Sequence, residues 1–170
     1  MAATYARYLA LYPRTTKAAT AAAIALVGDG GAQAHAGEPY NPQRAAAFVA
    51  WAALSTPLVH HWYLHLHRST PLRATLLDQL LWAPPSTAAF LFWMGLGASG
   101  RVDEALGRVQ SHLPVTLTAN WALWFPFQLL NFRFIGPAYQ ILATNVVGLG
   151  WSGLLSTLAQ PRAPTPAAPV

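Results

Sequence analysis

Charged side chains are scarcer in this sequence than in soluble proteins, and this scarcity constrains the fold more than any other feature. Asp, Glu, Lys and Arg make up 9% of the 170 residues, whereas an average soluble domain contains about 25%. Hydrophobic residues make up 54%, and seven Trp, seven Phe and six Tyr would leave large apolar patches on a surface facing water. The composition therefore excludes an ordinary soluble globular protein and indicates a chain surrounded by lipid.

The few charges divide the chain into long uncharged segments. Stretches of 22 to 28 residues without Asp, Glu, Lys or Arg lie between Arg44 and Arg68, Asp78 and Arg101, Arg108 and Arg133, and Arg133 and Arg162. About 20 apolar residues cross the hydrocarbon core of a bilayer as a helix. We therefore predict an all-α, multi-pass transmembrane helical bundle, with hydrophobic helices near residues 16–34, 45–66, 76–97, 114–132 and 138–158. Four spans are the alternative, if the last region is broken differently around Pro126 and Pro137.

The remaining segments complete the predicted organisation. Residues 1–160 are expected to form a single transmembrane domain, and the Pro/Ala-rich residues 161–170 a C-terminal tail. Apolar residues recur at helical spacing from Arg101 to His112 among charged and polar ones. This pattern predicts a short amphipathic helix, which lies either in the headgroup zone or in a solvated loop.

The distribution of charge favours one orientation in the membrane. With five spans, one side of the membrane carries six basic residues and no acid: Arg7, Arg14, Lys17, Arg68, Arg73 and Arg133. The other side carries four basic residues together with Glu38, Asp103 and Glu104. This asymmetry favours the side of the N-terminus as the positive one, and a basic surface of this kind suits anionic lipids.

Asp29 is the most conspicuous polar residue inside a predicted span. It lies four residues before Gln33, so both side chains project from one helical face. An ionised carboxylate at the bilayer centre costs about 2.5–3.5 kcal/mol on insertion scales. Two interpretations remain open: Asp29 pairs with an Arg or a hydrogen-bond donor between helices, or it lines a pore.

A stripe of amides marks the fourth predicted helix. Asn120, Trp124, Gln128 and Asn131 follow one another at spacings of four, four and three residues, which places them on one helical face. A face of this kind is turned toward other helices or water rather than lipid, and Asn145 on the last helix is expected to join it. The amides either hold helices together or line a hydrated conduit.

Other chemistry finds little support in the sequence. His61 and His65 have the spacing of two metal ligands, but neither a Cys nor a His on another predicted span is present to complete the site. No Lys/Arg cluster suits nucleic acid, and the GDGG segment at Gly28 lacks the Lys and Ser/Thr of a phosphate-binding loop. We therefore expect no catalytic residue, no metal, no cofactor and no nucleic-acid partner.

Five motifs in order along the chain resemble one family. They comprise Tyr12, Pro13 and Thr15 before a helix ending in Gly28, Asp29 and Gln33; Pro57, Trp62, Tyr63 and Leu66; Asp78, Gln79 and Pro84; Trp121, Trp124, Pro126, Gln128, Asn131, Phe132 and Pro137; and Trp151, Leu155 and Ser156. Together they resemble the Mpv17/PMP22 family of small multi-pass organellar membrane proteins. Two positions depart from the family pattern: this chain has Gln140 where the family usually has Arg, and Thr56 where the family usually has Gly.

The resemblance implies a protein of the mitochondrial inner membrane or, alternatively, of the peroxisomal membrane. It also implies a channel-like activity for small solutes. The missing Arg at position 140 removes a partner for a buried carboxylate, so we prefer an accessory, non-enzymatic subunit of a larger inner-membrane assembly, with a solute channel as the alternative. Expected partners are the lipid bilayer, including anionic lipids, and other membrane subunits.

The candidate site residues fall into two groups. The predicted polar bundle interior or pore lining comprises Asp29, Gln33, Asp78, Gln79, Asn120, Gln128, Asn131, Gln140 and Asn145. The predicted helix-packing residues and interface anchors are Pro57, Trp62, Tyr63, Trp121, Trp124, Pro126 and Trp151.

Overall fold

The fold is all-α, as predicted. The computed structural model describes residues 2–37 and 39–159, and the side chains within them of residues 3–37 and 39–151. Within these ranges the chain forms helices and no strand. By length and sustained hydropathy, no helix among these residues meets the requirement for crossing a membrane. The predicted tail at 161–170 lies outside the described residues.

Every predicted hydrophobic helix has a counterpart in the structure. The elements are α1 (Ala2–Leu11), α2 (Pro13–Ala36), α3 (Pro42–Leu66), α4 (Pro71–Leu77), the π-helical η1 (Asp78–Trp82), α5 (Ala83–Ser99), α6 (Val102–Phe134) and α7 (Gln140–Ala159). The third predicted helix corresponds to the continuous run from α4 through η1 to α5. Helix α1 was not predicted, because its sequence contains no long apolar stretch. It packs on α2.

Local residue chemistry explains where several helices begin and end. Pro occupies the first position of α2, α3 and α4, where its missing N–H has no intrahelical partner to lose. The Asn41 side chain caps α3 by accepting a hydrogen bond from the Arg44 amide. Gly37 ends α2 and Gly100 ends α5, both with positive φ, a conformation that favours glycine.

The predicted amphipathic segment 101–112 is not a separate helix. It forms the first part of α6, which continues through Pro114 and Pro126 to Phe134. Within this segment Ala105 is fully buried, whereas Val102 and Leu106 are exposed, as apolar residues of a helix in the headgroup zone would be. The close approach of α5 explains why Ala105 is the buried residue, since only a small side chain fits where the two helices meet.

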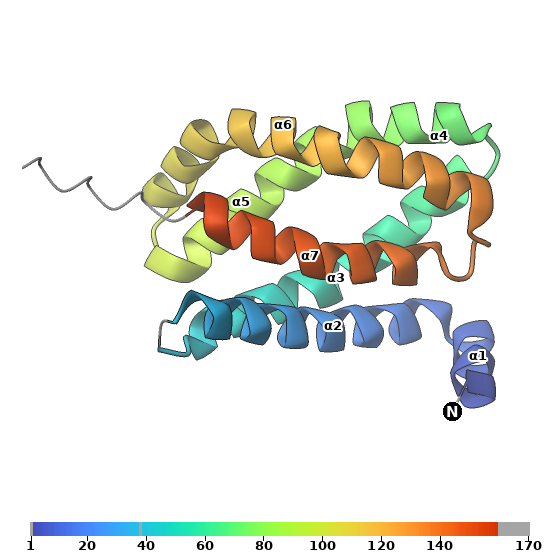
Figure 1. Cartoon of the computed structure of the whole chain (residues 1–170), viewed down its shortest axis with the longest axis horizontal. Helices are drawn as coiled ribbons and strands as arrows, with labels where there is room; N and C mark the ends of the chain where they lie inside the picture. The colour runs from blue at the N-terminus through green and yellow to red at the C-terminus, as the bar shows by residue number, and fades with distance from the viewer. Residues whose placement is uncertain (1, 38, 160–170) are drawn as a thin grey trace, which may run out of the picture.

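The helices run back and forth between two ends of the bundle (Figure 1). Helix α2 packs on α3 and α7, α5 packs on α6, and α3 also contacts α5. The link from α3 to α4 and the link from α6 to α7 lie at the end where α1 lies. The α2–α3 and α5–α6 links lie at the opposite end (Figure 1). The basic residues assigned to the N-terminal side in the five-span prediction therefore belong to elements that meet at one end.

Polar side chains are buried and large apolar ones are exposed to an unusual degree. The buried polar set includes Asp29, Asp78, Gln128 and Asn131, each at most 3% exposed. Leu, Val and aromatic side chains are exposed on most helices, among them Leu54, which is 62% exposed. The buried apolar cluster is small and comprises Tyr63, Leu66, Ala74 and Ile141. Polar contacts therefore have a large share in holding this bundle together.

Substitution of two glycines should have opposite effects on stability. A Cβ at Gly95 would lie 2.9 Å from the backbone Cα of Ala105, so Gly95→Ala forces α5 and α6 apart. We expect a loss of about 1–3 kcal/mol in unfolding free energy. Gly107→Ala adds its methyl group where no atom lies within 4 Å and should be neutral or stabilising by up to about 1 kcal/mol. Thermal unfolding in detergent measures both, and equal midpoints for the two variants would contradict the proposed close contact.

Candidate functional site: a central cavity and its polar network

A cavity of about 500 Å³ lies within the bundle, lined by residues of α2, α3, η1, α5, α6 and α7. Aromatic rings form much of its wall, with Phe48 and Trp51 of α3 facing Phe90 of α5 in edge-to-face contacts at centroid distances of 5.6 Å. Trp124 and Trp151 line another part of the wall, with 6.4 Å between their ring centroids. Volumes of this order accommodate small-molecule ligands in proteins, and their walls are typically apolar with a few polar groups.

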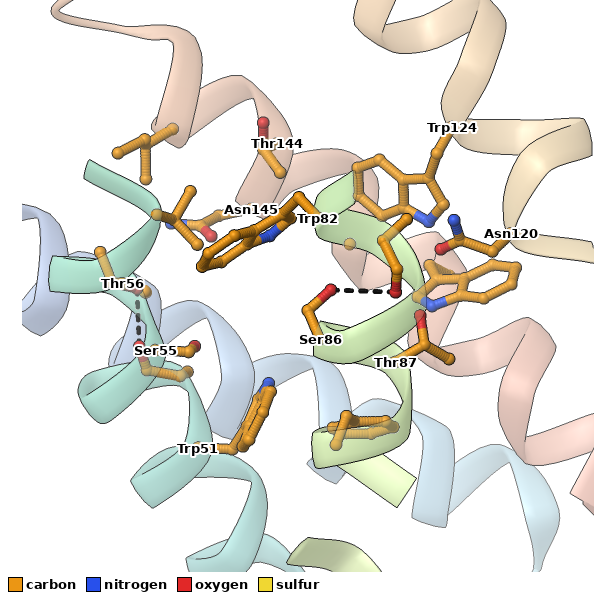
Figure 2. A pocket seen from close by; sticks show the side chains of 18 of the residues that line it. Trp51, Ser55, Thr56, Trp82, Ser86, Thr87, Asn120, Trp124, Thr144 and Asn145 are labelled. Carbon is orange, nitrogen blue, oxygen red and sulfur yellow. Dashed lines mark hydrogen bonds between the residues drawn. The ribbon is translucent and has the colours of Figure 1, made fainter. Parts of the chain in front are cut away.

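The polar groups of the wall come from several helices. Figure 2 shows Ser55 and Thr56 of α3, Ser86 and Thr87 of α5, Asn120 of α6, and Thr144 and Asn145 of α7 around the cavity. Asp78, Gln79 and Gln128 also line it, whereas no Lys, Arg or His is among its described lining residues. Nδ2 of Asn145 is buried and donates no hydrogen bond to the described part of the chain. The cavity therefore offers hydroxyl and amide groups and one carboxylate.

Asp78 is the centre of the polar network on this wall. Its Oδ1 accepts a hydrogen bond from Trp62 Nε1 at 2.9 Å, and its Oδ2 accepts from Gln79 Nε2 at 2.9 Å and Gln128 Nε2 at 3.0 Å. The Trp62 ring in turn stacks on Trp82, with 5.5 Å between centroids. The network thereby joins α3, η1 and α6 through a single carboxylate.

A π-helical turn carries Asp78 and Gln79, two consecutive residues that both face the interior. In η1 the Ala83 amide bonds to the Asp78 carbonyl, five residues back, which widens the turn. Asp78 and Gln79 are each 3% exposed, although neighbouring residues on an α-helix point about 100° apart. Gln79 also accepts from Asn120 at its side-chain oxygen and from Trp121 Nε1 at its backbone carbonyl.

A second part of the network joins α3, α6 and α7. Gln128 Nε2 also donates to the Tyr63 hydroxyl at 2.6 Å, and the Gln128 side-chain oxygen accepts from Asn131 at 2.8 Å. The Tyr63 hydroxyl lies 3.2 Å from Thr144 Oγ1 on α7. The amide stripe predicted on one helix face therefore contacts three other elements, and Asn131 is fully buried.

Gln140, where the family pattern has Arg, is buried at the start of α7. Its Nε2 donates to the backbone carbonyls of Ile135 and Asn131, at 3.0 and 3.5 Å. Asn131 lies in the last turn of α6, where its carbonyl also accepts from the Ile135 amide, and Ile135 is the residue that follows the helix. In this chain the residue therefore connects the end of α6 to the start of α7 without a charge.

Asp29 and Gln33 lie outside the cavity wall, near the opposite end of α2 from Lys17. Asp29 Oδ1 is 2.9 Å from Arg44 Nε, and its Oδ2 accepts from Gln33, as their spacing predicted. Gln33 also accepts from the Asn41 amide and donates to the Asn41 carbonyl. Since Asp29 is 1% exposed and these partners surround it, the arrangement favours the interhelical pairing over the pore-lining interpretation.

The predicted anchors occupy different environments. Tyr63 is buried, Trp62 is partly buried, and Trp121 is 40% exposed while it donates to Gln79. Trp124 and Trp151 line the cavity. Pro57 lies inside α3 and Pro126 inside α6, at partly buried and exposed positions respectively. These residues thus divide between helix packing, the cavity wall and the outer surface.

Several contacts were not evident from the sequence. Arg44 is 15 residues from Asp29, Trp62 is 16 from Asp78, and Lys17 Nζ lies 3.3 Å from His60 Nδ1 across 43 residues. No periodic pattern relates residues on different helices, so spacing alone gave no signal for these pairs. His61 and His65 bond to carbonyls of their own helix. No group of three metal-binding side chains occurs among the described residues.

Comparison with known proteins identifies similar chains. The model of the Mpv17 / PMP22 family matches residues 96–156. PXMP2/4 family protein 3 of Dictyostelium discoideum is 31% identical over 164 residues, covering 91% of this chain and 89% of its own. Peroxisomal membrane protein 2 of Bos taurus is 27% identical, and the match covers 92% of this chain and 88% of that protein. The mitochondrial inner membrane protein Mpv17 of Drosophila melanogaster is 32% identical, and the match covers 60% of this chain and 66% of that protein. No solved structure matches.

The Asp29–Arg44 pair should contribute measurably to stability. Arg44→Gln leaves a buried carboxylate without its cationic partner, so we expect a loss of about 2–4 kcal/mol in unfolding free energy. Asp29→Asn in the same chain should restore much of this loss, because it removes the unpaired charge. Thermal or denaturant unfolding of the single and double variants in detergent provides the measurement.

An exposed ion pair provides the matched control. Arg101 Nη2 lies 2.7 Å from Asp103 Oδ2, and the two side chains are 63% and 66% exposed. Arg101→Gln should change stability by less than about 1 kcal/mol. Equal effects of Arg44→Gln and Arg101→Gln would show that burial does not strengthen the Asp29 interaction.

Proposed function

Because this chain belongs to the Mpv17/PMP22 family, we propose that it is a multi-pass protein of an organellar membrane, the mitochondrial inner or the peroxisomal membrane. Relatives carry both locations in their names. Exposed apolar side chains such as Leu54, Leu58 and Val115 suit contact with lipid acyl chains. Long uncharged segments between the basic residues at the helix links agree with this placement.

The function best supported by the geometry is passage of small solutes through the bundle. The central cavity of about 500 Å³ is the observation that carries this proposal. A bundle that only supported neighbouring subunits would have no need for an interior space with polar groups from several helices. Asn145 and Asp78 place an amide and a carboxylate on the wall.

Passage requires movement of the helices that surround the cavity. Pro126 interrupts the backbone hydrogen-bond ladder of α6, and η1 interrupts the regular α-helix that joins α4 to α5. Such positions bend at a lower energetic cost than regular helix. We infer that bending at these two places changes the width of the path between η1 and α6.

A second candidate function is the accessory, non-enzymatic subunit preferred from the sequence. A separate hollow of about 370 Å³ on the outside of the bundle favours it. This hollow is lined by Leu80, which is 60% exposed, Trp121, Phe125 and Pro126, with Gln79 beneath. An apolar hollow of this kind suits a side chain of a neighbouring membrane helix.

Filling the cavity tests the channel. Gly148 lines the cavity and a Cβ there would meet no atom of the described residues within 4 Å, so Gly148→Leu places a bulky side chain in the cavity. We expect wild-type protein to conduct in planar bilayers and Gly148→Leu to lose at least half of that conductance. Gly150→Leu is the control, because Gly150 lies on the same helix, is exposed, and a Cβ there would likewise meet no atom of the described residues within 4 Å.

The same preparation distinguishes the two functions. An accessory subunit would show no conductance, and after mild detergent extraction it would migrate on native gels far above its mass of 18.3 kDa. Conductance that Gly148→Leu and Gly150→Leu leave equally unchanged would show that the current does not pass through the cavity.

A further inference from the structure

A buried positive charge lies outside the cavity, near the end of the bundle that carries α1. Lys17 is in the second turn of α2 and only 6% exposed. Its Nζ is 3.3 Å from Nδ1 of His60, which lies near the end of the antiparallel α3. A basic side chain is therefore buried against another nitrogen base rather than against an acid.

No described carboxylate compensates this charge. Asp29 pairs with Arg44, Asp78 is bonded to Trp62, Gln79 and Gln128, and Arg101 pairs with both Asp103 and Glu104. Buried ammonium groups normally have an anionic partner, because desolvation of an unpaired charge is costly. An anion supplied by a ligand would complete the environment of Lys17.

Further basic groups surround the same position. Arg14 lies three residues before Lys17 on α2, so their side chains share one helical face, and His67 directly follows α3. Partial desolvation and the charge of Lys17 hold the pKa of His67 below its ordinary value. Arg14 and His67 are exposed, and His60 is partly buried, so the cluster extends from the surface to the buried Lys17.

We propose that Lys17, His60 and Arg14, with His67 at the rim, form a binding site for a phosphate group. Phosphate has several acceptor oxygens and carries up to two negative charges, so that one group can accept from an ammonium, an imidazole and a guanidinium together. The phosphate belongs either to an anionic lipid headgroup at the membrane surface or to a phosphorylated solute. The site is separate from the cavity and independent of the proposed passage of solutes.

Binding to purified protein in a phosphate-free maltoside detergent tests this site with two probes. Phosphatidic acid represents the headgroup, and inorganic pyrophosphate represents the free solute. At least one probe should raise the unfolding midpoint of the wild-type protein and bind saturably. Stabilisation by phosphatidic acid alone would identify a lipid site, and stabilisation by pyrophosphate a site for phosphorylated solutes.

Two variants of the cluster report on the site itself. Lys17→Met keeps the apolar stem and removes the charge, so it should weaken binding about tenfold or more, as the loss of one charge-assisted hydrogen bond predicts. Without a probe, its unfolding midpoint should equal or exceed that of the wild type, because no uncompensated charge remains buried. His60→Gln should weaken binding without removing a buried charge, and it provides the second readout if Lys17→Met does not fold.

Arg133→Gln is the matched control, since Arg133 is an exposed basic residue at the end of α6. It should bind both probes as the wild type does. The proposal would be overturned if neither probe stabilises the wild type, if Arg133→Gln weakens binding as much as Lys17→Met, or if Lys17→Met is less stable without any probe and binds normally.

Discussion

The structure depends on one constraint: the polar side chains buried in this bundle must hydrogen-bond to one another, because the chain contains few other polar groups that could be their partners. Asp78 illustrates the constraint, since its two oxygens accept three hydrogen bonds from side chains of α3, η1 and α6. An unsatisfied polar group in a nonpolar environment costs several kcal/mol. The position of each helix relative to its neighbours is therefore tied to the geometry of a few side chains rather than to a large apolar core.

The same constraint connects stability with the proposed function. Asp78, Gln79 and Gln128 hold helices together and also line the cavity, so a movement that widens the cavity must exchange their hydrogen bonds for others. A solute or water in the cavity can supply such replacements, as can the hydroxyl groups of Ser86 and Thr144, which now bond to backbone carbonyls. The Asp29–Arg44 pair lies outside this wall and can hold α2 to α3 while the cavity changes.

The parts of the site that follow from local spacing were accessible from the sequence. Helical periodicity placed Gln33 beside Asp29, and Asn120, Gln128 and Asn131 on one face, because residues three or four apart are neighbours on any α-helix. Asp78 and Gln79 were accessible through the family motif, since no periodic pattern singled them out. The burial of Ala105 was not evident from the sequence, because it depends on the close contact with Gly95 of α5.

By itself, the sequence determined the helical class, the approximate extent of the hydrophobic helices and the polar residues placed inside, since composition and periodicity act within one helix. Only the tertiary structure decided that Arg44 pairs with Asp29, that Trp62 bonds to Asp78 and that Lys17 lies against His60. It also decided that a cavity remains between the helices. These features depend on how separate helices cross and rotate against one another, and many distant contacts fix that geometry together, so that no short stretch of sequence encodes it.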